Sequence, residues 1–259
     1  RLSGVFVADD YKSELGFVRR TDIFKINPQI ELKFWPKNSA IQRHSFTVIP
    51  ISIWRPELEF ENSDYTIISR WEANFLNSSQ LRVEMFNRYT KLYNEFDPTR
   101  TDNAIPLPAD ENYYYTSYNA SFRSDRRKKI SYRINPSIGQ FYNGKKYSLE
   151  TSLSVRLQPY FSGSIQMNYD KIDLPDPYPD ASIWLIGPKV DITFTKNMFW
   201  STFFQYSTQR ENFSINTRFQ WRVAPLSDLF LVYNDNYSTT IFSPRFRSLN
   251  LKFTYWLNI

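Results

Sequence analysis

Apolar and polar residues alternate along almost the whole chain, and this period of two constrains the fold more than any other feature. In 213–223 the odd positions carry Phe, Ile, Thr, Phe, Trp and Val, while the even positions carry Ser, Asn, Arg, Gln and Arg. The same pattern recurs in 147–158 and 249–257. Successive residues of a strand point to opposite faces, whereas a helix would spread these apolar residues around its circumference. The pattern therefore predicts an all-β chain.

The alternation predicts about fourteen strands, most of them long for a globular protein. They are expected near 15–24, 28–35, 45–54, 64–75, 80–91, 113–123, 129–140, 146–158, 161–170, 182–194, 198–207, 212–223, 228–236 and 245–257. Most approach the roughly 9–11 residues with which a tilted strand crosses a bilayer. Pro50 lies inside one of these strands and predicts a bulge, or a contact with a plug, at that point.

The expected links between strands are unequal in length. Short links near 77–79, 124–125, 196–197 and 224–227 alternate with longer ones near 55–63, 92–112, 171–181 and 237–244; those at 141–145 and 208–211 are intermediate. Counted back from the C-terminus, the short links fall on one side and the longer ones on the other. Outer-membrane barrels have this asymmetry, with short periplasmic turns. The C-terminus is therefore expected on the periplasmic side.

The polar face carries many large charged groups, which decide the predicted orientation of the two faces. A closed barrel of about fourteen strands is too wide for side chains to fill an apolar interior, whereas a polar interior is workable. We therefore predict a transmembrane antiparallel up-and-down β-barrel over 1–259, or part of a larger barrel, in a bacterial outer membrane. The candidate lumen-lining residues are Arg70, Glu72, Arg82, Glu84, Arg88, Arg133, Glu150, Arg156, Arg218, Arg222 and Lys252. Their cations either line a passage for anionic solutes or pair with the acids in a network that closes the lumen, and the mixed signs slightly favour the network.

Aromatic residues make up 18% of the chain, with 22 Phe, 18 Tyr and 7 Trp. Amphipathic rings collect at membrane–water interfaces, so rings near strand ends are expected to form girdles. The candidates are Tyr65, Phe75, Tyr114, Phe122, Trp184, Phe194, Trp200, Tyr206, Trp221 and Tyr255. A soluble β-rich binding module is the competing interpretation, but the long strands and only 6 glycines argue against a sandwich or propeller.

Residues for catalysis, cofactors or metal binding are scarce, and we predict no catalytic residue, cofactor or metal site. The chain has no Cys and a single His, His44, without a nucleophile motif to accompany it. The proline-rich loop near 170–180 offers weak Ca²⁺ or glycan candidates, for which an ordinary rigid loop is the preferred interpretation: Asp170, Asp173, Asp176, Tyr178 and Asp180. The basic run 126–129 is interpreted as a solvated turn, so no nucleic-acid partner is expected.

Three segments, 14–22, 221–234 and 251–257, contain the motifs Glu-Leu-Gly-Phe-Val-Arg-Arg-Thr-Asp, Pro-Leu-Ser-Asp-Leu-Phe-Leu-Val-Tyr-Asn and Leu-Lys-Phe-Thr-Tyr-Trp-Leu. Together they resemble the C-terminal domain of unknown function of Bacteroidetes-type outer-membrane proteins that carry an upstream carbohydrate-binding-module-family-9-like domain. The resemblance implies a barrel whose first strands lie upstream of Arg1, and it implies no established activity. Since the first residue is Arg, the chain is expected to be a mature product or a fragment.

The expected function is that of an anchor or transport-type component, linked to polysaccharide handling or envelope assembly. The expected partners are outer-membrane lipid and lipopolysaccharide, the barrel-assembly machinery, and other envelope proteins or glycans. Two alternatives stay open: a barrel-embedded hydrolase acting on lipid or glycan, and the soluble binding module.

Overall fold

The computed structural model describes residues 1–14, 16–18, 20–101 and 104–257, and these residues form an all-β chain, as predicted. One 3-10 turn, Pro56–Leu58, is the exception. No helix within these ranges is long and apolar enough to cross a membrane. The strands are β1 (Leu2–Val7), β2 (Ile23–Pro28), β3 (Ile30–Phe34), β4 (Ile41–Arg55), β5 (Glu61–Phe75), β6 (Gln80–Leu92), β7 (Glu111–Arg123), β8 (Ile130–Phe141), β9 (Gly144–Leu157), β10 (Phe161–Asp173), β11 (Ala181–Thr195), β12 (Met198–Ser207), β13 (Asn212–Ala224), β14 (Ser227–Ser238) and β15 (Pro244–Thr254).

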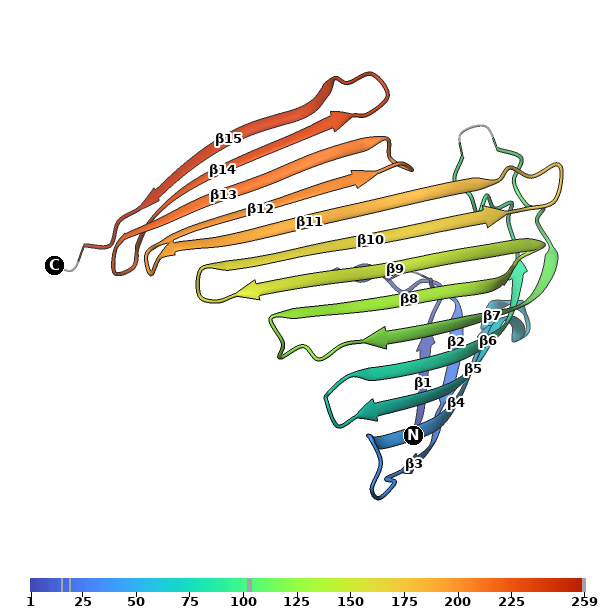
Figure 1. Cartoon of the computed structure of the whole chain (residues 1–259). Helices are drawn as coiled ribbons and strands as arrows, with labels where there is room; N and C mark the ends of the chain where they lie inside the picture. Colours follow the sequence, from blue (N-terminus) through green and yellow to red (C-terminus); the bar gives the residue numbers. More distant parts are fainter. Residues whose placement is uncertain (15, 19, 102–103, 258–259) are drawn as a thin grey trace. The chain divides into compact units, whose positions relative to one another are not determined.

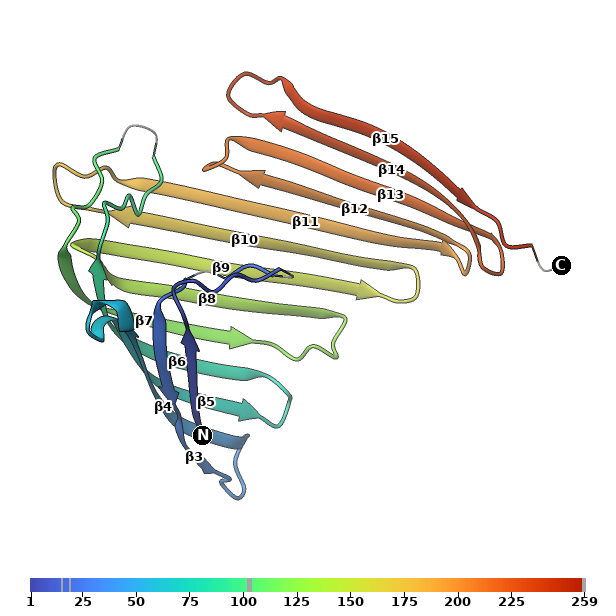
Figure 2. The same cartoon turned by 180° about the vertical axis from the view of Figure 1, so that it is seen from behind.

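The strands form one antiparallel up-and-down sheet in which neighbours along the chain are neighbours in space (Figure 1). The hydrogen-bonded order runs from β1 through β2 and β4 to β15, with β3 paired to β4 beside it. The order has two ends, β1 and β15, so the prediction is confirmed as far as an up-and-down antiparallel sheet. The chain divides into two compact units: unit 1 comprises Arg1–Phe122, Pro136–Tyr147 and Lys171–Ala181, and unit 2 comprises Arg123–Asn135, Ser148–Asp170 and Ser182–Ile259. Strands β4 to β6 lie side by side in unit 1, as do β12 to β15 in unit 2 (Figure 2).

Strands β2 and β3 behave as one strand interrupted at Gln29, because both pair with β4 in a common register, while β2 also pairs with β1 on its other side. That register places Pro28 opposite Pro50, and neither proline has an N–H group to donate to the ladder. The pairing is therefore broken between β2 and β3. The bulge that was one of the two expectations for Pro50 does not occur, because Pro50 pairs with Ile67 in continuous register. The irregularities of the β4–β5 ladder lie between Ile41 and Arg43 and between Ile53 and Trp54.

In unit 1 the large apolar side chains are exposed on one face of the sheet, and several polar side chains on the other face are buried. The ladder β3–β4–β5–β6 places apolar side chains beside apolar ones on neighbouring strands, as for Leu32 and Phe46. The exposed apolar side chains of this face include Ile30, Leu32, Phe46, Val48 and Val83. On the opposite face Ser45, Thr47 and Glu84 retain exposed fractions of 2, 3 and 8%.

Unit 2 has the same division into an apolar and a polar face. The register aligns Phe219, Leu231 and Leu251 on one face of β13, β14 and β15. On the other face it aligns Arg218 with Val232. Across all described residues, the buried hydrophobic side chains are only Ala73, Leu107, Tyr115 and Ile172. Soluble domains bury most of their large apolar residues and rarely expose a continuous apolar surface, so this distribution is inverted.

Several expected boundaries are wrong because strand length depends on the partner strand. The first strand, β1, was not expected, and the expected strand 15–24 is mostly a non-strand segment before β2; Leu15 and Arg19 lie outside the described residues. The last strand ends at Thr254, short of Tyr255, since its partner β14 begins at Ser227. The link expected at 124–125 extends over 124–129, and that expected at 141–145 shrinks to 142–143. The alternation of short and longer links therefore holds only in part.

We expect Gly139→Ala to destabilise the sheet. A Cβ atom at Gly139 would lie 2.3 Å from Cα of Ser117 in the neighbouring strand β7, so the two backbones must separate. Overpacking of this kind costs about 1–3 kcal/mol. The matched control is Gly4→Ala, whose added Cβ would approach Lys25 O no closer than 3.7 Å. Urea unfolding of both variants checks this, and an equal loss in the two would contradict the close approach.

Candidate functional site

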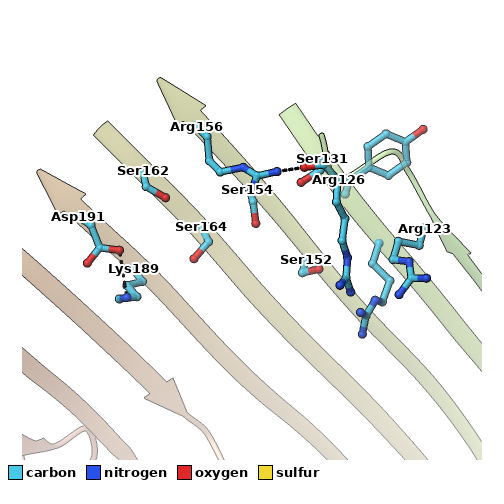
Figure 3. A pocket seen from close by; sticks show the side chains of 12 residues that line it. Arg123, Arg126, Ser131, Ser152, Ser154, Arg156, Ser162, Ser164, Lys189 and Asp191 are labelled. Atoms are coloured by element: carbon cyan, nitrogen blue, oxygen red, sulfur yellow. Dashed lines mark hydrogen bonds and ion pairs between the residues drawn. The ribbon is translucent and has the colours of Figure 1, made fainter. Parts of the chain in front are cut away.

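A basic hollow on the polar face of unit 2 is the candidate site, and we call it the β8–β11 hollow (Figure 3). It has a volume of about 380 Å³. Strands β8, β9, β10 and β11 form its floor, and Arg123 and Arg126 reach it from β7 and the following link. Its lining residues are Arg123, Arg126, Ser131, Tyr132, Arg133, Ser152, Ser154, Arg156, Ser162, Ser164, Lys189 and Asp191.

Serines at alternate positions create the hollow. Ser152 and Ser154 in β9, and Ser162 and Ser164 in β10, are two residues apart, so each pair points to one face of the sheet. Serine side chains are short, whereas the arginines and lysine around them are long. The difference in length leaves a depression floored by hydroxyl groups and walled by cations.

The charge of the hollow is strongly unbalanced, with five cationic residues and one acid, Asp191, among its lining residues. Asp191 is already engaged: Lys189 lies 3.0 Å from it, and the Ser201 hydroxyl donates to it at 2.6 Å. Among the described residues, the side chains of Arg126 and Arg133 form no hydrogen bond or ion pair. Arg156 donates to the backbone carbonyl of Arg126. The hollow therefore has cations available for an anionic ligand.

Two arginines of the link before β8 differ in their surroundings: Arg127 forms an ion pair, whereas Arg126 lines the hollow. Arg127 pairs with Asp125 at 3.0 Å, and the Asp125 carboxylate also accepts the backbone N–H of Arg127 at 2.9 Å. The side-chain hydrogen bond from Arg127, with the backbone one, lowers the pKa of Asp125. Because Arg127 is held by Asp125, Arg126 is the residue of this run that lines the hollow.

A second hollow, in unit 1, has a volume of about 690 Å³ but differs in charge. Its cations are paired: Arg20 with Asp64, Arg55 with Asp22, and Lys91 with Glu61. Tyr93 donates to Glu61 at 3.0 Å, and burial together with this hydrogen bond raises the pKa of Tyr93 to about 12. Because its cations are already paired with acids, this second hollow attracts a charged ligand less strongly than the β8–β11 hollow does.

The other candidate lumen-lining residues fall into paired and unpaired groups. In unit 1, Arg70 lies 2.6 Å from Glu84, and Arg82 lies 2.8 Å from Glu72. Arg88 donates to Ser117 at 2.7 Å. In unit 2, Glu150 accepts from Asn135 at 3.0 Å, and Arg222 lies 3.4 Å from Asp228. Within the described chain, Arg218 and Lys252 form no hydrogen bond or ion pair through their side chains.

The candidate girdle residues lie at both ends of the strands in each unit. In unit 1, Tyr65 and Tyr114 lie at one end, where Tyr89 connects them with ring centroids 5.4 and 4.8 Å away; Phe75 and Phe122 lie at the other. In unit 2, Trp184 and Tyr206 lie at the ends of β11 and β12 opposite to those of Phe194 and Trp200. Trp221 lies opposite Met198, and Tyr255 follows β15 with its ring 6.2 Å from that of Phe253.

The loop carboxylates and His44 are not brought into a reactive arrangement. Asp173 lies 3.1 Å from Lys171, and Asp180 accepts the Leu174 N–H at 3.0 Å. Asp170 lies in β10, while Asp176 and Tyr178 lie in the link 174–180. No group of three His, Cys, Asp or Glu residues that could hold a metal occurs in the described part of the chain. His44 stacks on Phe34 with ring centroids 5.2 Å apart.

Sequence reasoning found Arg133 and Arg156 but not the site around them. It left out Arg123 and assigned Arg126 to a solvated turn. The available signal was the row of serines at alternate positions in 131, 152–154 and 162–164, which the predicted registers would have placed on neighbouring strands.

We expect Glu84→Gln to lower stability, because it leaves Arg70 without its countercharge at a half-buried position. The expected loss is about 1–3 kcal/mol. The control is Glu31→Gln, whose partner Lys33 lies 3.2 Å away in an exposed pair, and its expected loss is below about 1 kcal/mol. Urea unfolding measures both; equal losses would show that burial gives the Arg70–Glu84 pair no added importance.

The candidate site is thus a serine-floored, cation-walled hollow with a single acid. Comparison of the chain with family models, with curated proteins and with solved structures finds no match.

Proposed function

We propose that the chain is a transmembrane β-barrel of a bacterial outer membrane, acting as a transport-type component or an anchor. The inverted distribution of side chains carries this proposal. Large apolar residues are exposed on one face of the sheet, whereas buried Glu84 and the β8–β11 hollow lie on the other. Lipid accepts an exposed apolar face at no cost. In this proposal the sheet closes into a barrel, which removes the two unpaired edges at β1 and β15.

Strand length and aromatic placement support the same proposal. Strands such as β4 and β5 have 15 residues, and β6 and β7 have 13, which suffices for a tilted strand to cross the hydrocarbon layer. The rings of Tyr65, Tyr89 and Tyr114 form a row near one end of their strands. Such rows favour the depth of the lipid headgroups.

The resemblance noted in the sequence extends the proposal to the rest of the protein. In this proposal the chain is the membrane part of a longer envelope protein with an upstream carbohydrate-binding domain, and its partners are outer-membrane lipid, lipopolysaccharide and the assembly machinery. The alternative, a barrel-embedded hydrolase, has little support, because the ring of His44 stacks on Phe34 and contacts Phe46 edge to face.

Phe203 and Phe204 allow a matched test of the lipid-facing side. Phe204 lies on the apolar face opposite Ile215, and its neighbour Phe203 lies on the polar face opposite Asn216. We expect Phe204→Arg to lower folding stability in phosphatidylcholine vesicles by about 2–4 kcal/mol, as for a cation at mid-bilayer depth. Phe203→Arg should cost much less. Urea titration of vesicle-folded protein measures both; a native fold in water without detergent, with equal effects of the two variants, would favour the soluble module.

Planar bilayers distinguish a transport-type component from an anchor. Because the cations of the β8–β11 hollow exceed its acids, an open lumen should give stepwise conductance with a preference for chloride over potassium. The reversal potential in a KCl gradient measures this preference. Insertion without conductance would assign the anchor role, and a cation preference would contradict the assignment of the hollow to the passage.

A further inference from the structure

We infer that the β8–β11 hollow binds a phosphate or sulfate ester carried on a small polar body such as a sugar. The inference names a ligand class for the polar face. The hollow is built from three groups of residues within unit 2: the arginines of 123–133 and 156, the serines of β8 to β10, and the Lys189–Asp191 pair.

Uncompensated positive charge in the hollow favours an anionic ligand. Arg126 and Arg133 have no hydrogen-bonding or ionic partner among the described side chains, and both are exposed in the hollow. Clustered like charges repel one another, and a bound anion relieves the repulsion. Elsewhere on the polar face, cross-strand acids such as Glu72 and Glu84 give their arginines countercharges. Within the described part of the chain, neither Arg126 nor Arg133 forms such an ion pair.

The arrangement of cations and hydroxyl groups suits a tetrahedral oxyanion. Figure 3 shows Arg123 and Arg126 on one side of the serines, and Lys189 with Asp191 on the other. A planar guanidinium binds two oxygens of a tetrahedral oxyanion at once, and serine hydroxyls donate to its remaining oxygens. Asp191 repels an anion at its own side, so the ester group is placed at the arginine side, over Ser152.

The size of the hollow limits the ligand to a small molecule. A volume of about 380 Å³ lies near the lower end of small-molecule sites, which is suitable for one oxyanion and a single sugar ring. Tyr132 is the single aromatic residue of the lining, so a row of stacked bases has no platform. The sugar contacts are expected from serine hydroxyls.

The inference rests on the proposed function only for the route by which a ligand reaches the polar face. Binding to folded protein in detergent solution requires no membrane insertion. Failure to bind would overturn this inference alone, whereas failure to insert into vesicles would overturn the proposed function alone.

The experiment is calorimetric titration of the folded chain with glucose 6-phosphate, glucose 6-sulfate and glucose. Both esters are expected to bind more tightly than glucose, and binding should weaken as salt is raised. Arg133→Gln should weaken ester binding about tenfold or more, because it removes a charge-assisted contact. Affinity that rises between about pH 5 and 7 identifies phosphate as the preferred group, since its second ionisation lies near pH 6; a pH-independent preference for the sulfate identifies sulfate.

The matched control is Arg218→Gln, which removes another polar-face arginine, in β13 and outside the hollow. It should leave ester binding nearly unchanged. Arg126→Gln, in the link before β8, provides a second test should the β8 variant fail to fold. The inference is overturned by equal binding of esters and glucose, or by equal losses in Arg218→Gln and in the hollow variants.

Discussion

The backbone ladder between antiparallel neighbours is the constraint on which the rest of the structure depends. Apart from β2 and β3, which both pair with β4, each strand hydrogen-bonds to the next along the chain, so the register decides which side chains share a face. A shift by one residue would move every apolar side chain of a strand to the polar face. Proline positions, which lack an N–H donor, show the same dependence. Where Pro28 and Pro50 face each other, the ladder to β4 is interrupted, and this interruption separates β2 from β3.

The sheet has little hydrophobic core of its own. Its apolar residues, such as Ile30, Val48 and Leu251, are exposed, so burial within the chain contributes little to holding the strands together. Ladder hydrogen bonds and cross-strand pairs must contribute more, and the apolar face requires apolar surroundings. A membrane supplies them, and this requirement links the inverted faces to the proposed location.

The charged side chains of the polar face occur in two arrangements. Where an acid lies opposite a cation across the ladder, as Glu84 does for Arg70, the charges compensate each other. In the β8–β11 hollow the lining residues are serines and an excess of cations over acids. The same alternating scaffold thus gives a stabilising network in unit 1 and an anion-attracting depression in unit 2. The difference arises from whether acids or serines accompany the arginines.

The sequence by itself determined the fold class, most strands and the division into two faces, because a period of two is a local property that follows from strand geometry. It also placed Arg133 and Arg156 on the polar face. The tertiary structure alone decided β1, the end of β15 at Thr254 and the true lengths of the links, because a strand extends only as far as its partner. It alone brought Arg126 beside Arg133 and the serines of β9 and β10, because that grouping depends on the path of the link before β8 and on the exact register between consecutive strands.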